Sequence, residues 1–223
     1  MSRDFELPEF LFLVAAIRWT LLLSAVAFAG GFLGGFGLAL MRVSRSAPLR
    51  LVARGYIGLF QGTPLLVQLF IAYYGLPVLL GIRIEAWPAV AGAFTLYASA
   101  FLGEIWRGAI MAVPESQWEA ARALALRRGA TLRKVILPQA LRIAIPPTVG
   151  FLVQLIKSTS VASIIGFVEL ARAGQLIVNV TFQPMIVYPV IAVLYFAICW
   201  PLSLLAGRLE RRLDSRQGLV AAA

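Results

Sequence analysis

The sequence has 223 residues, of which 61% are hydrophobic and 13% are charged, and its mean hydropathy is +0.87. A soluble domain exposes more polar surface than this composition supplies, so we expect an all-α integral membrane protein that forms one domain over residues 1–223. The absence of histidine and the single cysteine exclude a His/Cys metal site, an intrachain disulfide and acid–base catalysis by histidine. The net charge of +10 does not indicate nucleic-acid binding, because the basic residues fall in blocks between apolar runs.

The apolar runs predict five membrane-spanning helices, at residues 10–41, 55–80, 86–106, 143–168 and 185–207. The first nine residues carry three acids against one arginine, unlike the positive leading region of a secretory signal, so we expect span one to remain uncleaved. Fifteen of the 20 basic residues follow span one, separate spans three and four, or follow span five. Because such basic segments stay in the cytoplasm, the amino terminus is predicted to be periplasmic and the carboxyl terminus cytoplasmic.

Span one contains the sequence GGFLGGFG. Its glycines pair at a spacing of four, Gly30 with Gly34 and Gly31 with Gly35, which lets helix backbones approach closely. We interpret this stretch as ordinary helix packing against a neighbouring helix.

A basic segment between spans three and four, residues 114–138, is predicted to form two short helices that meet at a corner. Ser116 and Glu119 form a capping box that would start the first helix at Ser116. Gly129 can end that helix, and Thr131 can cap a second helix that stops at Pro138.

This segment has several interpretations from its residues alone: a solvated basic loop, a helix on anionic lipid, a topology signal, or a surface that binds a partner. A helix on lipid usually presents bulky apolar residues. Here the apolar positions are mostly alanines, at Ala120, Ala121, Ala123 and Ala125. A flat alanine surface favours docking against a partner protein.

The segment resembles the cytoplasmic signature loop of ABC-importer permeases, EAA-x3-G-x9-I-x-LP. The matching residues are Glu119, Ala120, Ala121, Leu137 and Pro138, with Val135 as a mild substitution. Ala125 stands where the family has glycine, so the corner is expected either there or at Gly129. The resemblance extends over nearly the whole chain to the polar amino acid branch, through YIGLFQGTPLLVQLFIAYYGLP (56–77), YASAFLGEIWRGAI (97–110), LIKSTSVASIIGFVEL (155–170) and LERRL (209–213).

The resemblance implies a multi-pass permease subunit of the bacterial inner membrane that carries polar amino acids. It implies as partners two ATP-binding cassette subunits, a second permease subunit (identical or different), and a periplasmic or lipid-anchored amino acid-binding protein. The chain itself would bind membrane lipid but no nucleic acid and no cofactor, and it would carry no catalytic site, because ATP and Mg²⁺ belong to the ATPase subunits. The cytoplasmic loop would transmit the movement of the ATPases to the spans.

The candidate substrate pathway centres on Lys157, a basic residue within an apolar span, where charges are functional candidates. The polar residues Ser158, Thr159 and Ser160 follow it and predict a helix interruption, a feature of transporter sites. A structural lysine that extends toward the interface is an equal alternative. The resembled family often has an acid at Ser158. Gln154 completes this group.

Three further acids remain open from the sequence. Glu104, near the inner edge of span three, is another pathway candidate, although an ion pair with Arg107 is the simpler interpretation. Glu85 and Glu169 on the outer side are interpreted as loop charges, with contact to a binding protein as the alternative. The rival functions are a permease-like scaffold that binds no substrate and an ion-driven secondary transporter. A membrane-embedded enzyme is disfavoured because the spans offer few catalytic groups.

Overall fold

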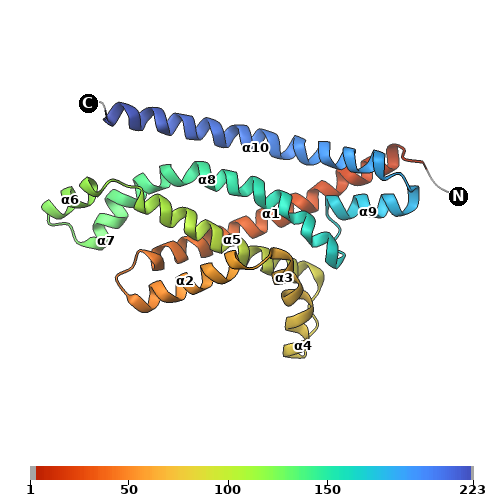
Figure 1. Ribbon diagram of the computed structural model, residues 1–223, viewed down its shortest axis with the longest axis horizontal. Coiled ribbons are helices and arrows are strands. Elements are labelled where there is room, and N and C mark those ends of the chain that lie inside the picture. Colours follow the sequence, from red (N-terminus) through yellow and green to blue (C-terminus); the bar gives the residue numbers. More distant parts are fainter. Residues whose placement is uncertain (1–3, 222–223) are drawn as a thin grey trace.

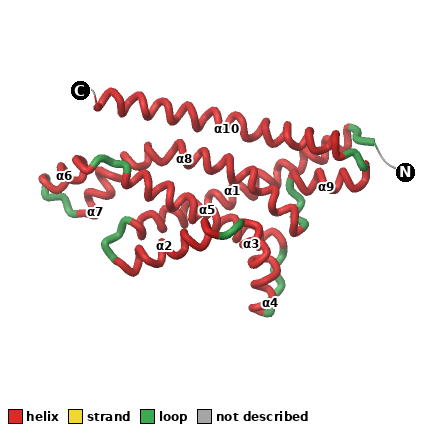
Figure 2. Tube along the Cα trace, in the orientation of Figure 1, coloured by secondary structure: helices red, strands yellow, loops and turns green. Residues whose placement is uncertain are grey.

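The structure is a computed structural model that describes residues 4–221. The structure does not describe the side chains of residue 212 and residues 214–221, which belong to the basic carboxyl-terminal tail. The described residues form helices joined by short loops and contain no strand (Figures 1 and 2). The elements are α1 (Leu7–Arg42), α2 (Ala47–Gly62), α3 (Leu65–Phe70), η1 (Ile71–Gly75), α4 (Leu76–Leu80), α5 (Ala86–Met111), α6 (Glu115–Ala123), α7 (Arg128–Thr131), η2 (Leu132–Ile136), α8 (Leu137–Ser158), η3 (Thr159–Ile165), α9 (Leu170–Thr181) and α10 (Pro184–Ala221).

Among the described residues, four helices are long and apolar enough to cross a membrane, and a bent pair makes a fifth. The single helices are Leu7–Arg42, Ala86–Met111, Arg128–Ile165 and Pro184–Arg211, and the pair is Ala47–Gly62 with Leu65–Leu80. This agrees with the expected all-α membrane protein of several spans.

The glycines of α1 pack against α5. A Cβ atom added to Gly31 would lie 2.5 Å from the Cβ of Ala98, and one added to Gly35 would lie 2.8 Å from the backbone nitrogen of Gly103. Real Cβ atoms do not approach so closely, so these positions require glycine. The predicted close packing is confirmed, and the neighbour is α5. Trp106 of α5 closes this interface edge-on against two phenylalanines of α1.

The segment expected at 55–80 is not one helix. Thr63 is extended (φ −119°, ψ 144°), and α2 and the helices that follow it meet at 102°. The cause is Pro64, which disfavours the helical region for the residue before it and has no N–H to continue the helix. The side-chain amide of Gln68 donates to the carbonyls of Phe60 (2.8 Å) and Thr63 (3.0 Å), which the break leaves without helical partners.

The connections gather at the two ends of the bundle. The α1–α2 turn, the α6–α7 connection and the carboxyl end of α10 lie at one end, and α9 lies at the other, beside the start of α1 (Figure 1). Arg128 of α7 donates to the carbonyl of Val43 in the α1–α2 turn at 2.9 Å, which ties the first two of these together. At the opposite end, the Gln183 amide donates to Asp4 at 2.8 Å.

Candidate functional site

The α6–α7 connection begins differently from the predicted capping box. Pro114 is the N-cap of α6, so the helix starts at Glu115, and no side chain caps it. The prediction that Ser116 caps the helix is wrong. Pro114, whose φ is fixed by its ring, occupies the N-cap position, so Ser116 lies inside the first turn. Glu115 in that first turn pairs instead with Arg122, at 2.7 Å.

The end of α6 is a Schellman motif. Leu126 N–H donates to the carbonyl of Ala121 at 3.1 Å, and Ala125 N–H donates to the carbonyl of Arg122 at 2.9 Å. Between these bonds Ala125 adopts the left-handed conformation, with φ of 54°. This is the place in the motif where glycine is usual, and it is also the place where the resembled signature carries glycine. The corner therefore lies at Ala125, and the alternative corner at Gly129 is wrong.

The second half of the connection is a continuous helix into α8. α7 starts at Arg128, so Gly129 is helical and Thr131 is not a cap; the Thr131 side chain is buried and donates to the Arg127 carbonyl at 3.3 Å. The predicted stop at Pro138 is wrong too. The wider turn η2 precedes Pro138, which lies near the start of α8. Such a turn accommodates the missing N–H and the ring without ending the helix.

The corner has an inner and an outer face. Ala121 and Ile136 are buried, and half-buried Trp118 packs against the same core as α1 and α5. Glu119, Ala120 and Leu124 are exposed. The inner face thus fixes the corner to the bundle, and the outer face, with Ala120 between the larger Glu119 and Leu124, is open to the surroundings.

The polar run after α8 caps that helix. The hydroxyls of Ser158, Thr159 and Ser160 donate to the carbonyls of Gln154 (2.9 Å), Ile156 (2.7 Å) and Lys157 (2.8 Å). These bonds satisfy carbonyls where the α-helix gives way to the 3-10 helix η3, so the expected interruption is present.

The side chain of Lys157 is exposed, which is compatible with both interpretations that the sequence left open. Gln154, one turn earlier, is exposed on the same face of α8. The apolar run around Lys157 did not show which side of the span the lysine would lie on.

Glu104 lies apart from this group. It is ion-paired with Arg107, whose Nε is 2.8 Å from Glu104 Oε1, and Arg42 of α1 lies 3.8 Å from its other oxygen. The rings of Phe101 and Phe151 stack at 5.5 Å and set the register of α5 against α8. Counting from these rings, Glu104 and Lys157 are about 14 Å apart along the bundle. The structure therefore does not bring the two together.

A second helix break, missed by the sequence analysis, lies beside η3. α3 contacts η3, so the bend at Pro64 and the end of α8 are neighbours. Gln68 is buried at this bend, and its side-chain oxygen has no hydrogen-bond partner within the described residues. The signal available in the sequence was the Gly62-Thr63-Pro64 triplet followed by an isolated glutamine.

Glu169 is neither a loop charge nor an exposed contact, which corrects the prediction for it. Its side chain is fully buried at the start of α9, where it accepts from the N–H groups of Ala171 (2.9 Å) and Arg172 (2.8 Å) and from the Tyr195 hydroxyl (2.8 Å). Burial raises the pKa of the Glu169 carboxyl, and these hydrogen bonds oppose the rise. The sequence signal was an acid directly before a helix-forming run.

Comparison with known proteins covers almost the whole chain. Residues 11–217 match the family model described as "Binding-protein-dependent transport system inner membrane component". The chain is 38% identical over 206 residues to the probable amino-acid ABC transporter permease protein YckA of Bacillus subtilis, covering 92% of this chain and 91% of YckA. It is 40% identical over 203 residues to the L-cystine transport system permease protein TcyB of the same organism, covering 91% and 86%.

Solved structures agree. The chain in the structure titled "Crystal structure of an amino acid ABC transporter with histidines" superposes with a TM-score of 0.85 at 36% identity, covering 90% of this chain and 94% of that one. The inward-facing MetNI methionine ABC transporter shares the fold at 21% identity, with a TM-score of 0.79 and coverage of 93% and 99%. With most of its length matched in each comparison, the chain belongs to the family of binding-protein-dependent transport system inner membrane components, the permease subunits of ABC transporters.

Proposed function

We propose that this chain is the permease subunit of an ATP-driven importer that receives a polar amino acid from a binding protein. The observation that carries the proposal is the corner at Ala125. The helix that follows it, α7, continues through η2 into α8 without a break, and the inner face of the corner packs into the core. Relatives named for cystine, glutamine and octopine transport support the substrate class.

The orientation follows from charge. The α1–α2 turn, the α6–α7 corner and the carboxyl end of α10 carry the basic blocks and lie at one end of the bundle (Figure 1). The positive-inside rule assigns this end to the cytoplasm of a bacterial inner membrane. α9 and the start of α1 are then periplasmic, where a binding protein can reach them.

In this proposal two ATPase subunits bind ATP and Mg²⁺, and each binds the outer face of the α6–α7 corner of one permease subunit. A second permease, identical or different, completes the pathway. When the ATPases close, each corner moves with α8, because η2 joins them without a flexible residue. Glu119, Ala120 and Leu124 form the gripped surface, and Ala121, Leu137 and Pro138 keep the corner attached to the span.

The test replaces the small outer residue. Ala120→Arg introduces a bulky charge on the outer face and should reduce uptake far more than ATP hydrolysis in proteoliposomes that contain the whole complex. Ala120→Ser keeps the surface small and should behave as the native protein. Ala121 is not suitable, since it is 3% exposed and a large residue there would damage the packing itself. Coupled uptake by Ala120→Arg at the native rate would contradict the proposal.

The proposed substrate pathway runs along the exposed face of Lys157 and Gln154 and past the bend at Gln68. Broken helices in the middle of a bundle are where transporters place their sites. Lys157→Ala should raise the KM for uptake with unchanged protein level, and Lys157→Arg should keep it near the native value. An unchanged KM in Lys157→Ala would remove this residue from the pathway. Uptake should first be measured with a panel of labelled amino acids.

A scaffold subunit without substrate contact is the second candidate. It is favoured by the three hydroxyls after Lys157, which are all engaged with backbone carbonyls and carry no acid for a cationic substrate. Uptake by a complete complex in which this chain is the sole kind of permease subunit would exclude the scaffold function.

A further inference from the structure

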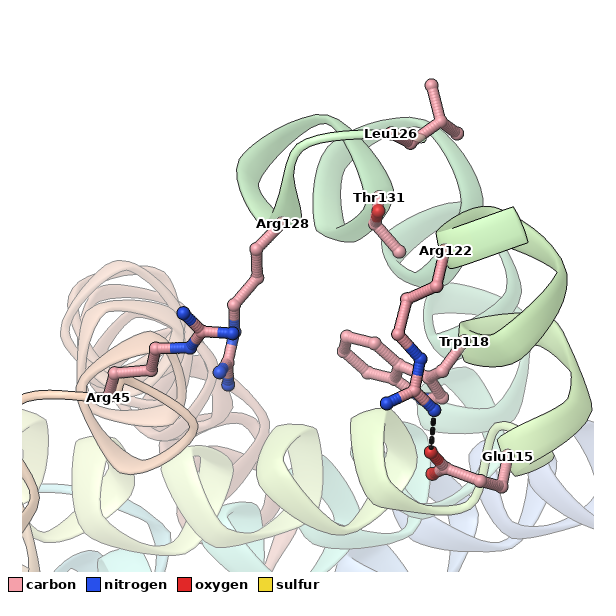
Figure 3. A pocket seen from close by; sticks show the side chains of 7 residues that line it. All are labelled: Arg45, Glu115, Trp118, Arg122, Leu126, Arg128 and Thr131. Atoms are coloured by element: carbon pink, nitrogen blue, oxygen red, sulfur yellow. Dashed lines mark hydrogen bonds and ion pairs between the residues drawn. The ribbon is translucent and has the colours of Figure 1, made fainter. Parts of the chain in front are cut away.

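A pocket of about 380 Å³ lies at the cytoplasmic end, between the α1–α2 turn and the inner edge of the corner. Its lining residues are Arg45, Glu115, Trp118, Arg122, Leu126, Arg128 and Thr131. Figure 3 shows Arg45 and Arg128 entering from two different elements with their guanidinium groups close together, while Trp118 and Arg122 lie on the opposite side and Thr131 lies between.

The positive charge of the pocket is not balanced. Arg122 pairs with Glu115 at 2.7 Å, so these two neutralise each other. In the part of the chain that the structure describes, no carboxylate pairs with Arg45 or Arg128, and Arg128 donates only to the Val43 carbonyl, at 2.9 Å. Two neighbouring guanidinium groups repel each other unless an anion lies between them, and their planar donors match the oxygens of a phosphate.

The pocket is not on the surface assigned to the ATPase. Glu115, Trp118 and Arg122 are spaced three and four residues apart and share one face of α6. Ala120 and Leu124 lie on the other side of that helix, where they are exposed, and Glu119 lies between the two faces. A partner protein that contacts Ala120 and Leu124 therefore leaves the pocket open to another ligand.

The place of the pocket suits a lipid headgroup. Arg45 lies in the turn that follows α1, three positions after Arg42, the last residue of that span, so it stands just beyond the end of the span. Headgroup phosphates lie just outside the hydrocarbon core, and basic pockets between spans on the cytoplasmic side suit anionic headgroups. Trp118 beside the pocket is a residue type favoured at this interface.

We propose that Arg45 and Arg128 bind a phosphate group in this pocket, and that the phosphate belongs to an anionic phospholipid of the cytoplasmic leaflet. Arg122 and Thr131 border the rest of the headgroup. The proposal requires the membrane orientation given above but no particular transport substrate.

The test measures binding to the purified full-length permease in detergent by native mass spectrometry and titration. The probes are dioctanoyl-phosphatidylglycerol, dioctanoyl-phosphatidylcholine and inorganic phosphate. The native protein should prefer phosphatidylglycerol. The double variant Arg45→Gln/Arg128→Gln should weaken that binding at least about tenfold, because a single charge-assisted hydrogen bond is worth roughly that factor.

The matched control is Arg133→Gln/Lys134→Gln, which removes the same charge at exposed positions outside the pocket and should change binding less than about twofold. Equal weakening in both double variants would mean non-specific attraction and would overturn the site. Phosphate that binds as tightly as the lipid would overturn the lipid as its source. Unchanged lipid binding in Arg45→Gln/Arg128→Gln with loss of ATPase co-purification would assign the pocket to a partner carboxylate. Binding is read without transport, so a failed importer assay leaves this result interpretable.

Discussion

Replacing Ala125 with glycine is expected to stabilise the corner between α6 and α7. Ala125 has φ of 54°, a region that costs an L-residue roughly 1–2 kcal/mol. Glycine avoids this cost but loses about 0.5–1 kcal/mol more backbone entropy on folding. At the centres of these two ranges, the net gain in free energy of unfolding of the corner is about 0.5–1 kcal/mol.

Hydrogen exchange at the corner measures this gain. The amide of Leu126 donates to the Ala121 carbonyl at 3.1 Å and is released when the corner opens. Ala125→Gly should raise the protection of this amide about two- to fivefold, after correction for the intrinsic rate beside glycine. The apparent melting temperature of the purified permease should rise by about 1–4 °C if the corner unfolds with the bundle.

The control is Ala123→Gly, two residues earlier. Ala123 is the last residue of α6 and is exposed, so glycine there brings no conformational relief and should reduce protection. Opposite signs in the two variants are the signature of a left-handed Ala125. If both variants lose protection, the assignment of strain to Ala125 is incorrect.

Four other predictions concern helix packing, the buried acid Glu169 and the bend at Pro64. Gly35→Ala should destabilise the bundle by about 1–3 kcal/mol, because its Cβ would lie 2.8 Å from an α5 backbone nitrogen, whereas Gly37→Ala, with nothing within 4 Å, should not; thermal unfolding in detergent separates them. Glu169→Ala should lower the free energy of unfolding by about 2–3 kcal/mol, since it removes the cap of α9 and leaves the Tyr195 hydroxyl without its acceptor. A loss no larger than that caused by replacing an exposed acid with alanine would contradict this. Because burial raises the pKa of Glu169, the folded protein holds that proton more tightly than the unfolded chain, so the stability it supplies is complete below the ordinary glutamate pKa and is lost as the pH rises through the raised value; Glu169→Gln should flatten melting-temperature profiles in that window. Gln68→Leu should increase hydrogen exchange around the α2–α3 bend, as two carbonyls lose their donor; unchanged exchange would mean that Pro64 alone holds the bend.

Much of the architecture was predictable from local sequence. Apolar runs of sufficient length identify spans wherever the helix is straight, and the basic blocks between them group the loops by side. The glycine spacing of Gly31 and Gly35 predicted a close helix contact, because that property belongs to the residues themselves. The signature around Glu119 located the corner and its alternatives, since a Schellman turn is a local structure.

Only the tertiary structure decided how these pieces are used. Whether Lys157 points outward, whether Glu169 is buried, and which helix receives the α1 glycines depend on neighbours more than a hundred residues away or on another span, as in the bond from Leu170 N–H to the Thr20 hydroxyl at 3.1 Å. The basic pocket depends on the same long-range folding, because Arg45 and Arg128 stand 83 positions apart in the chain. Periodicity and composition describe one helix at a time, whereas burial and charge pairing are properties of the faces that helices turn toward each other.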